Sequence, residues 1–295
     1  MNKDLKEKFG FTLAEGATHV GIFHNIGGTL QRLVESFTHV GIFHNTRRVG
    51  FTLAEVLITL GIIGIVSALT IPNLINKFEE KRTVTLLKET YSMLSQAMIY
   101  AVNENGPAEN WDRGTQSMSS GDIFKATDNF ANIFTKYLRI SRRCGNTQKE
   151  RLNCWGGDTD IFTKLNGSKL TVYFDAAASI PYILANGAKF MLTVNDSNLY
   201  PSCKNINNVP CGVIYIKTNN QKDNIMGKNI FRFGIYSDKI MPMGHQKATY
   251  HSFANTCQTH HSNSGLGCTA WVIENGNMDY LHCDDLSWNG KRKCD

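Results

Sequence analysis

Residues 50–74 read GFTLAEVLITLGIIGIVSALTIPNL, a long apolar stretch. Between Phe51 and Ile71 the only ionisable side chain is that of Glu55. At a rise of about 1.5 Å per residue, a helix of this length covers the roughly 30 Å hydrocarbon core of a bilayer. The stretch therefore predicts a membrane-spanning helix at residues 51–75, and the rest of the chain is organised around it.

Two residues of this helix are unusual for a membrane span. A carboxylate such as Glu55 costs about 2.5–3.5 kcal/mol near the helix centre and less near its end, so it needs a neutralising partner. The span contains no Lys or Arg, and the partner must come from elsewhere. Pro72 lacks the N–H of a helical hydrogen bond and clashes with the preceding turn, which predicts a kink near residues 70–72.

A Gly followed by Phe-Thr-Leu-x-Glu and an apolar helix resembles the type IV pilins and the pseudopilins of type II secretion systems. The resemblance implies that a prepilin peptidase cuts after Gly50 and N-methylates Phe51. It also implies that Glu55 pairs with this terminal amine on a neighbouring subunit and that Pro72 is the helix-kinking proline of the family.

A secretory signal peptide and an ordinary membrane anchor are the alternatives. A signal peptide has a shorter apolar region followed by a small-residue cleavage site. The only close match, Val66-Ser67-Ala68, lies inside an apolar run that continues to Ile75. An ordinary anchor has no need of Glu55 beside a Gly-Phe junction, so the sequence favours the pilin-like interpretation.

The first fifty residues contain two internal repeats. GFTLAE occurs at residues 10–15 and 50–55, and THVGIFHN occurs at residues 18–25 and 38–45. The upstream GFTLAE is followed by polar residues and glycines where a span should be. Removing residues 11–50 would join MNKDLKEKFG to FTLAEVLITLGIIG, a short Lys-rich leader. We therefore interpret residues 1–50 as a leader that is removed, and residues 11–50 as an insertion by duplication.

The leader also contains four histidines, a residue type that commonly binds metals. Because they occur as two copies of one repeat, duplication explains their spacing without a metal site; they are His19, His24, His39 and His44. Arg47 and Arg48 directly precede the span, and a basic flank keeps that side cytoplasmic. We expect a single-pass protein of the bacterial inner membrane, with its C-terminal part in the periplasm or in a cell-surface filament.

Beyond the span, residues 76–104 are expected to continue the helix as an amphipathic segment. Six apolar residues recur at helical spacing on one stripe: Val84, Leu87, Tyr91, Leu94, Met98 and Val102. The helix is expected to end near Asn103, because Asn105-Gly106-Pro107 is a typical stop. Residues 105–295 would then form an extracytoplasmic globular head.

The head shows one helical pattern and several strand patterns. Apolar residues at helical spacing predict a second helix at residues 121–143. Strands are expected at residues 170–174, 188–194, 212–218 and 230–236. Asn275-Gly276-Asn277 predicts a hairpin between residues 269–274 and 278–283. The predicted fold class is α+β and pilin-like, with a long N-terminal helix packed against an antiparallel sheet and stapled by disulfides.

Eight cysteines follow the span, and the leader and span have none. An even number confined to the exported part predicts disulfides in an oxidising compartment. Eight cysteines allow 105 connectivities. Sequence separations of 10, 8, 11 and 11 residues favour four small loops: Cys144 with Cys154, Cys203 with Cys211, Cys257 with Cys268, and Cys283 with Cys294. A zinc site at Cys257, His260, His261 and Cys268 is the alternative, which an oxidising compartment disfavours.

Residues 217–229, KTNNQKDNIMGKN, correspond to a loop in which many pseudopilins hold calcium with aspartates. The resemblance places Lys217 and Asn229 at the matching positions. Calcium prefers hard oxygen ligands, and here two carboxylates are missing and a cation is added. We therefore expect no calcium here, and a surface loop shaped by Asn and Gly.

No catalytic pattern is present: the sequence lacks GxSxG, HExxH and a phosphate-binding glycine loop. The head histidines, at 245, 251, 260, 261 and 282, are scattered. The net charge is +6. Residues 1–50 hold six basic and four acidic residues, which leaves +4, unclustered, for the remainder and disfavours nucleic-acid binding. We expect no catalytic, cofactor-binding or metal-binding residue.

The sequence thus predicts a non-enzymatic structural subunit, a pilin or pseudopilin, of a type IV pilus-like or type II protein-secretion filament. The expected partners are a prepilin peptidase, other pilin or pseudopilin subunits, an inner-membrane assembly platform and the lipid bilayer. Two alternatives stay open. One is a minor tip subunit for adhesion or DNA uptake, and the other is a membrane-anchored binding module or hydrolase that does not polymerise.

Overall fold

The computed structural model describes residues 51–115, 119–145, 147–157, 161–171, 180–195, 197–200, 202–204, 209–248 and 251–294. The predicted leader with its repeats and histidines, Gly50, and the end of the strand expected at residues 170–174 lie outside these ranges. The chain divides into two units, Met1–Ile63 and Gly64–Asp295, and each is described by itself.

Helix α2, Leu53–Asn105, contains both the apolar stretch and the amphipathic segment. Residues 51–78 are exposed apart from the half-buried Ser67. Of the predicted stripe, the buried members are Val84, Leu87, Leu94 and Met98, and Tyr91 and Val102 pack partly buried against the same core. The helix ends two residues later than expected, where Gly106 adopts a φ of 74°. Pro72 lies inside the helix, with helical residues on both sides.

Six antiparallel strands form the main sheet in the order β1-β4-β5-β6-β7-β8. They are β1 Ile140–Arg143, β4 Tyr182–Leu184, β5 Lys189–Val194, β6 Gly212–Lys217, β7 Ile230–Ile235 and β8 Ile240–Pro242. Leu192, Ile214 and Phe233 lie opposite one another across the three central strands. Strands β2 Ile161–Thr163 and β3 Lys169–Thr171 form a separate two-stranded sheet. The three predicted central strands are thus present within one residue of their expected ends.

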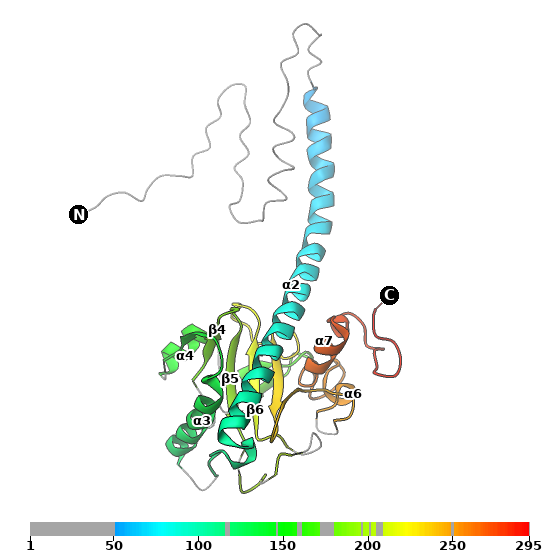
Figure 1. The fold of residues 1–295 in the computed structure, drawn as a ribbon. Coiled ribbons are helices and arrows are strands. Elements are labelled where there is room, and N and C mark those ends of the chain that lie inside the picture. The colour runs from blue at the N-terminus through cyan, green and yellow to red at the C-terminus, as the bar shows by residue number, and fades with distance from the viewer. Residues whose placement is uncertain are drawn as a thin grey trace, which may run out of the picture. The chain divides into compact units, whose positions relative to one another are not determined.

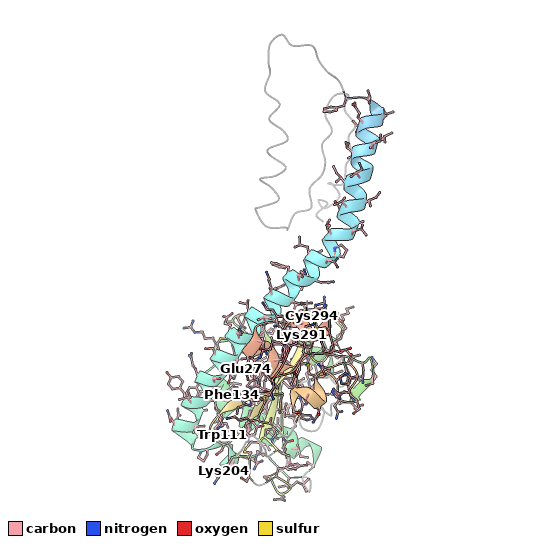
Figure 2. All side chains as sticks on the ribbon, turned by 90° about the vertical axis from the view of Figure 1, so that its right-hand side faces the viewer. Trp111, Phe134, Lys204, Glu274, Lys291 and Cys294 are labelled. Atoms are coloured by element: carbon pink, nitrogen blue, oxygen red, sulfur yellow. A yellow bond between two sulfur atoms is a disulfide. The ribbon has the colours of Figure 1, made fainter. Side chains whose placement is uncertain are left out.

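One face of the main sheet is covered by three helices. Figure 1 shows α3 (Ser120–Thr135) and α7 (Thr269–Asn275) on either side of the C-terminal half of α2. Helix α3 contacts β5, and α7 contacts β7 and β8. Tyr91 of α2 stacks on Phe233 with ring centroids 5.5 Å apart. Trp111 and Phe134, both labelled in Figure 2, are buried in this core. Aromatic and aliphatic burial on this face provides most of the head's apolar contacts.

The opposite face of the sheet has a smaller core. Trp155, at the end of α4 (Gln148–Trp155), stacks on Phe162 of β2, and Phe162 meets the ring of Tyr215 edge to face at 5.8 Å. This core also contains Met191 and Met226. Because both faces are covered, β6 and β7 are buried along their whole length. The protein is therefore an α+β protein with a long apolar N-terminal helix and an antiparallel sheet.

The predicted hairpin at residues 269–283 is wrong. The structure has helix α7 followed by a short 3-10 helix, η2, at Asp279–Leu281. Gly276 has a φ of 67° and donates its N–H to the carbonyl of Val272, so the Asn-Gly pair ends a helix instead of turning a hairpin. Trp271 and Val272 are consecutive and both buried, which a strand with one solvated face would not allow.

The second predicted helix, at residues 121–143, is too long. Helix α3 covers Ser120–Thr135, with its N-terminus capped by the Ser119 hydroxyl. The residues from Ile140 onward form β1, which pairs with β4, and the following Cys144 is bonded to Cys154. Apolar residues continue at helical spacing beyond Thr135, so their spacing did not indicate where the helix ends.

Three short elements were not predicted. They are α4, the 3-10 helix η1 (Ala108–Asn110) and α6 (Phe253–Thr256). Strands β1, β2, β4 and β8 were not predicted either, and each has at most four residues. Segments this short carry too little periodicity to be recognised from spacing alone.

Candidate assembly site

The N-terminal end of α2 contains the residues expected to act in processing and assembly. Glu55 and Thr52 form a reciprocal cap: the Thr52 N–H and hydroxyl donate to Glu55 Oε2 at 2.8 and 2.9 Å, and the Glu55 N–H donates to the Thr52 hydroxyl at 3.2 Å. This arrangement satisfies N–H groups that a helix start leaves unpaired. In the single chain the Glu55 carboxylate therefore has hydrogen-bond donors, and the sequence from Phe51 to Ile71 supplies no cation.

The apolar surface behind Glu55 is continuous. Phe51 is 86 % exposed, and the large apolar side chains along the next seven turns are exposed as well: Leu53, Val56, Leu57, Ile58, Leu60, Ile62, Ile63, Ile65, Val66, Leu69, Ile71, Leu74, Ile75 and Phe78. An apolar surface of this extent is stable in lipid or against other apolar helices, and not in water. By length and composition α2 can cross a membrane.

Where α2 reaches the head, it is joined to the C-terminal segment. His282 Nε2 lies 2.8 Å from the Glu80 carboxylate. The Cys283–Cys294 disulfide closes the segment that follows His282. Figure 2 labels Cys294 and Lys291 in this segment. The end of the chain is therefore fastened to the helix just beyond its apolar half.

The eight cysteines form four disulfides: Cys144–Cys154, Cys203–Cys211, Cys257–Cys268 and Cys283–Cys294. These are the pairs that the sequence separations favoured. The zinc alternative is wrong, because the sulfurs of Cys257 and Cys268 are bonded to each other. His260 and His261 lie side by side, with ring centroids 3.9 Å apart. Within the described ranges no three His, Cys, Asp or Glu side chains come together in a way that could hold a metal.

The loop at residues 217–229 has a lysine ammonium surrounded by oxygen atoms. Lys217, at the end of β6, donates to the carbonyl of Gly156 (2.5 Å), the carbonyl of Gln221 (2.6 Å) and Asn224 Oδ1 (2.7 Å). Its side chain is fully buried. Burial, together with the neighbouring Lys189 ammonium, lowers the pKa of Lys217 to about 8, so it stays protonated at neutral pH.

Asn229, the other position singled out in this loop, is 2 % exposed. Its Oδ1 accepts from the Ile225 N–H at 2.7 Å, and its Nδ2 donates to the Asp223 carbonyl at 2.8 Å. Asn229 therefore shapes the loop by hydrogen bonding to its backbone, although it is buried and not part of the surface loop that the sequence predicted. The role of Lys217 was not predictable, since Gly156 lies 61 residues away in the chain.

The head histidines are exposed or half-buried. His245 lies 3.7 Å from Glu274, and His282 contacts Glu80. His251 has a φ of 53°, and burial followed by the nearby Arg232 charge lowers its pKa to about 3. His251 is thus neutral at physiological pH, and none of these positions was singled out by the sequence.

The described residues define an α+β protein whose apolar N-terminal helix can serve as a membrane anchor for a disulfide-bonded head. Residues 73–277 match a family described as a family of unknown function (DUF6613). The match covers more than half of the chain, so the protein belongs to this family. It begins directly after Pro72 and leaves out the GFTLAE motif. No curated protein and no solved structure matches the chain.

Proposed function

We propose that this protein is a pilin-like structural subunit, inserted in the bacterial inner membrane and assembled through α2 into a type IV pilus-like or type II secretion filament. The proposal rests on two features of α2. Glu55 lies near the start of the helix, and the apolar surface that follows it is not covered by any other part of the described residues. Identical helices packed side by side would bury that surface. Contacts of this kind generate a filament when the rotation between neighbouring copies does not close into a ring.

Processing would create the second half of the assembly contact. Cleavage after Gly50 by a prepilin peptidase gives Phe51 a free amine, which the peptidase then methylates. This amine is the cation that the span itself does not supply. In the lipid or among helices, an ion pair between Glu55 of one copy and the Phe51 amine of the next would remove the penalty of an unpaired carboxylate.

The capping contact with Thr52 is compatible with this role. It holds the Glu55 carboxylate at the helix start, where the neighbouring amine would arrive, and it uses Oε2, so that Oε1 has no hydrogen bond within the described residues. A carboxylate can accept from several donors at once, so Thr52 and an incoming amine need not compete. The disulfide-bonded head would face outward and would have no enzymatic role.

Replacement of Glu55 tests the proposal. Glu55→Gln keeps the shape and the hydrogen bonding to Thr52 but removes the charge, and Glu79→Gln is a matched control on the same helix beyond the span. We expect Glu55→Gln to be cleaved and inserted into the membrane like the wild type but to give at least tenfold fewer filaments, measured by shearing and electron microscopy. Glu79→Gln should assemble normally.

The same experiment separates the alternatives. A membrane-tethered binding module that does not polymerise would be unaffected by Glu55→Gln in abundance and localisation, and no filament containing the protein would be found in the wild type. A minor tip subunit would be found at filament ends, and immunogold labelling of the head distinguishes it from a subunit spread along the filament.

A further inference from the structure

The Lys217 ammonium occupies a site that resembles the coordination shell of a bound cation. A protonated lysine has three N–H donors. Each has one acceptor here: the carbonyl oxygens of Gly156 and Gln221 and the side-chain oxygen of Asn224, at 2.5, 2.6 and 2.7 Å. The side chain has no solvent exposure. All three donors are therefore satisfied by protein oxygens.

None of the three oxygens belongs to a carboxylate. Asp223 is the acidic group whose charge acts on Lys217, and its side chain is exposed. The cross-strand neighbour of Lys217 is Lys189, a second buried cation, which donates to the Trp155 carbonyl at 2.9 Å. A buried ammonium without a carboxylate is unfavourable unless hydrogen bonds replace its hydration. The oxygen shell supplies this replacement.

The shell joins two parts of the head that are distant in sequence. Gly156 ends α4 as its left-handed C-cap, and Gln221 and Asn224 belong to the connection between β6 and β7. Carbonyl groups at a helix C-terminus carry partial negative charge and favour a nearby cation. Without the ammonium, the three oxygens would face one another and repel.

Two glycines at the end of α4 allow its backbone to approach the β6–β7 connection closely. Gly157 has a φ of 122°, and a Cβ at this position would lie 2.0 Å from the Lys222 carbonyl oxygen. At Gly156 a Cβ would come within 3.2 Å of the Lys189 ammonium. Only glycines let α4 end this close to the β6–β7 connection. The contact between the two segments is therefore specified at several positions.

We propose that Lys217 is the resident cation of an oxygen site that locks the β6–β7 connection onto the C-terminus of α4, in the structural role of a bound metal ion. Asn229 shapes the connection itself, and Lys217 fixes it to the neighbouring helix. The site selects for a primary ammonium, because three N–H donors match three acceptors. A side chain shortened at this position leaves a site for a small alkylammonium ion.

Hydrogen exchange of the full-length chain in detergent micelles tests the proposal. Lys217→Met keeps the apolar part of the side chain and removes the ammonium. We expect backbone amides of residues 224–229 and of the last turn of α4 to exchange at least tenfold faster than in the wild type. Lys189→Met is the matched control: it removes the adjacent buried ammonium, and protection of residues 224–229 should change less than threefold. Unchanged protection in Lys217→Met would overturn the proposal.

Chemical rescue provides a second test. In Lys217→Ala, propylammonium should restore the protection of residues 224–229, whereas tetramethylammonium, which has no N–H donor, should not. Equal effects of the two ions on the protection of residues 224–229 would contradict the proposed ammonium site. If neither Lys217 variant folds, NMR of Lys189→Met labelled with ¹⁵N-lysine gives the answer, because this variant removes the other buried ammonium. The buried, triply bonded Lys217 ammonium predicts a slowly exchanging lysine NH₃⁺ signal in this variant, and the absence of such a signal would overturn the proposal.

Discussion

His251 shows how one half-buried residue links the stability of the head to pH. Its backbone is left-handed, with a φ of 53°, a conformation uncommon for residues other than Gly and tolerated best by Asn, Asp and His. Burial, followed by the nearby Arg232 charge, lowers its pKa from 6.5 to about 3. Below pH 6.5 the unfolded chain takes up a proton at this position that the folded head does not, so the free energy of unfolding decreases as the pH falls.

The substitution His251→Asn tests this pH dependence, because asparagine tolerates the left-handed backbone and does not titrate. Between pH 6.5 and 4.5 the wild type should lose roughly 1–2 kcal/mol more stability than His251→Asn. Thermal unfolding followed by circular dichroism at several pH values measures the difference. Parallel curves for the two proteins would show that His251 is protonated normally in the folded head.

At the level of single residues, the sequence was informative where a residue's partner is close in the chain. Cysteine pairs 8 to 11 residues apart could be proposed from their separation. A loop shaped by Asn and Gly was expected at residues 217–229, and Asn229 does bond backbone groups within that loop. Lys217 was noticed only as a residue that disfavours calcium, because its partner Gly156 is brought to it by the fold.

Among the helices, α2 has two parts with different requirements. In its second half, Leu94 is fully buried in the main core, whereas Ile99 is 57 % exposed. Truncation of a buried leucine leaves a cavity and removes apolar contacts, which costs about 2–5 kcal/mol.

We therefore expect Leu94→Ala to lower the free energy of unfolding of the head by about 2–5 kcal/mol, and Ile99→Ala by less than about 0.5 kcal/mol. Denaturant unfolding in detergent, followed by tryptophan fluorescence, measures both. Equal losses would mean that the second half of α2 does not pack on the sheet in solution.

The errors in the predicted elements have local causes. The pair Asn275-Gly276 is typical of a hairpin turn, but an Asn-Gly pair can also end a helix. Here it ends α7, in which the consecutive residues Trp271 and Val272 are both buried. Conversely, Asn186-Gly187 does lie in the turn between the antiparallel strands β4 and β5, where no hairpin was predicted. Thr147 and Glu150 form a capping box at the start of α4, and this pattern can be recognised in the sequence.

For the whole molecule, the disulfides offer a matched comparison. Cys257–Cys268 and Cys283–Cys294 both close separations of 11 residues, so their effects on the entropy of the unfolded chain should be equal. Cys257 and Cys268 are fully buried in the main core, whereas Cys283 and Cys294 are half-buried.

Replacing each pair by alanine should lower the stability of the head by about 2–4 kcal/mol. The loss should be larger for Cys257 and Cys268, because their removal also leaves a cavity in the core. Thermal unfolding of the two double variants under non-reducing conditions measures the order. A larger loss for Cys283 and Cys294 would show that fastening the C-terminal segment to α2 matters more than packing in the core.

For the described residues, the predicted α+β class was confirmed, with a long apolar helix, an antiparallel sheet and four disulfides. Periodicity over many residues identified α2 and the central strands, because these elements are long enough to show it. The order of the strands, the second core around Trp155 and the position of α4 depend on contacts between distant segments, which spacing does not reveal.

We propose that the chain is a pilin-like subunit that is cut after Gly50, at the second of two identical GFTLAE motifs. Mass spectrometry of the N-terminal peptide, from protein purified out of membranes or filaments, tests it most directly. The proposal predicts a mature chain that begins at Phe51 with one added methyl group. A mature chain that begins at Phe11, or that retains residues 1–50, would contradict it.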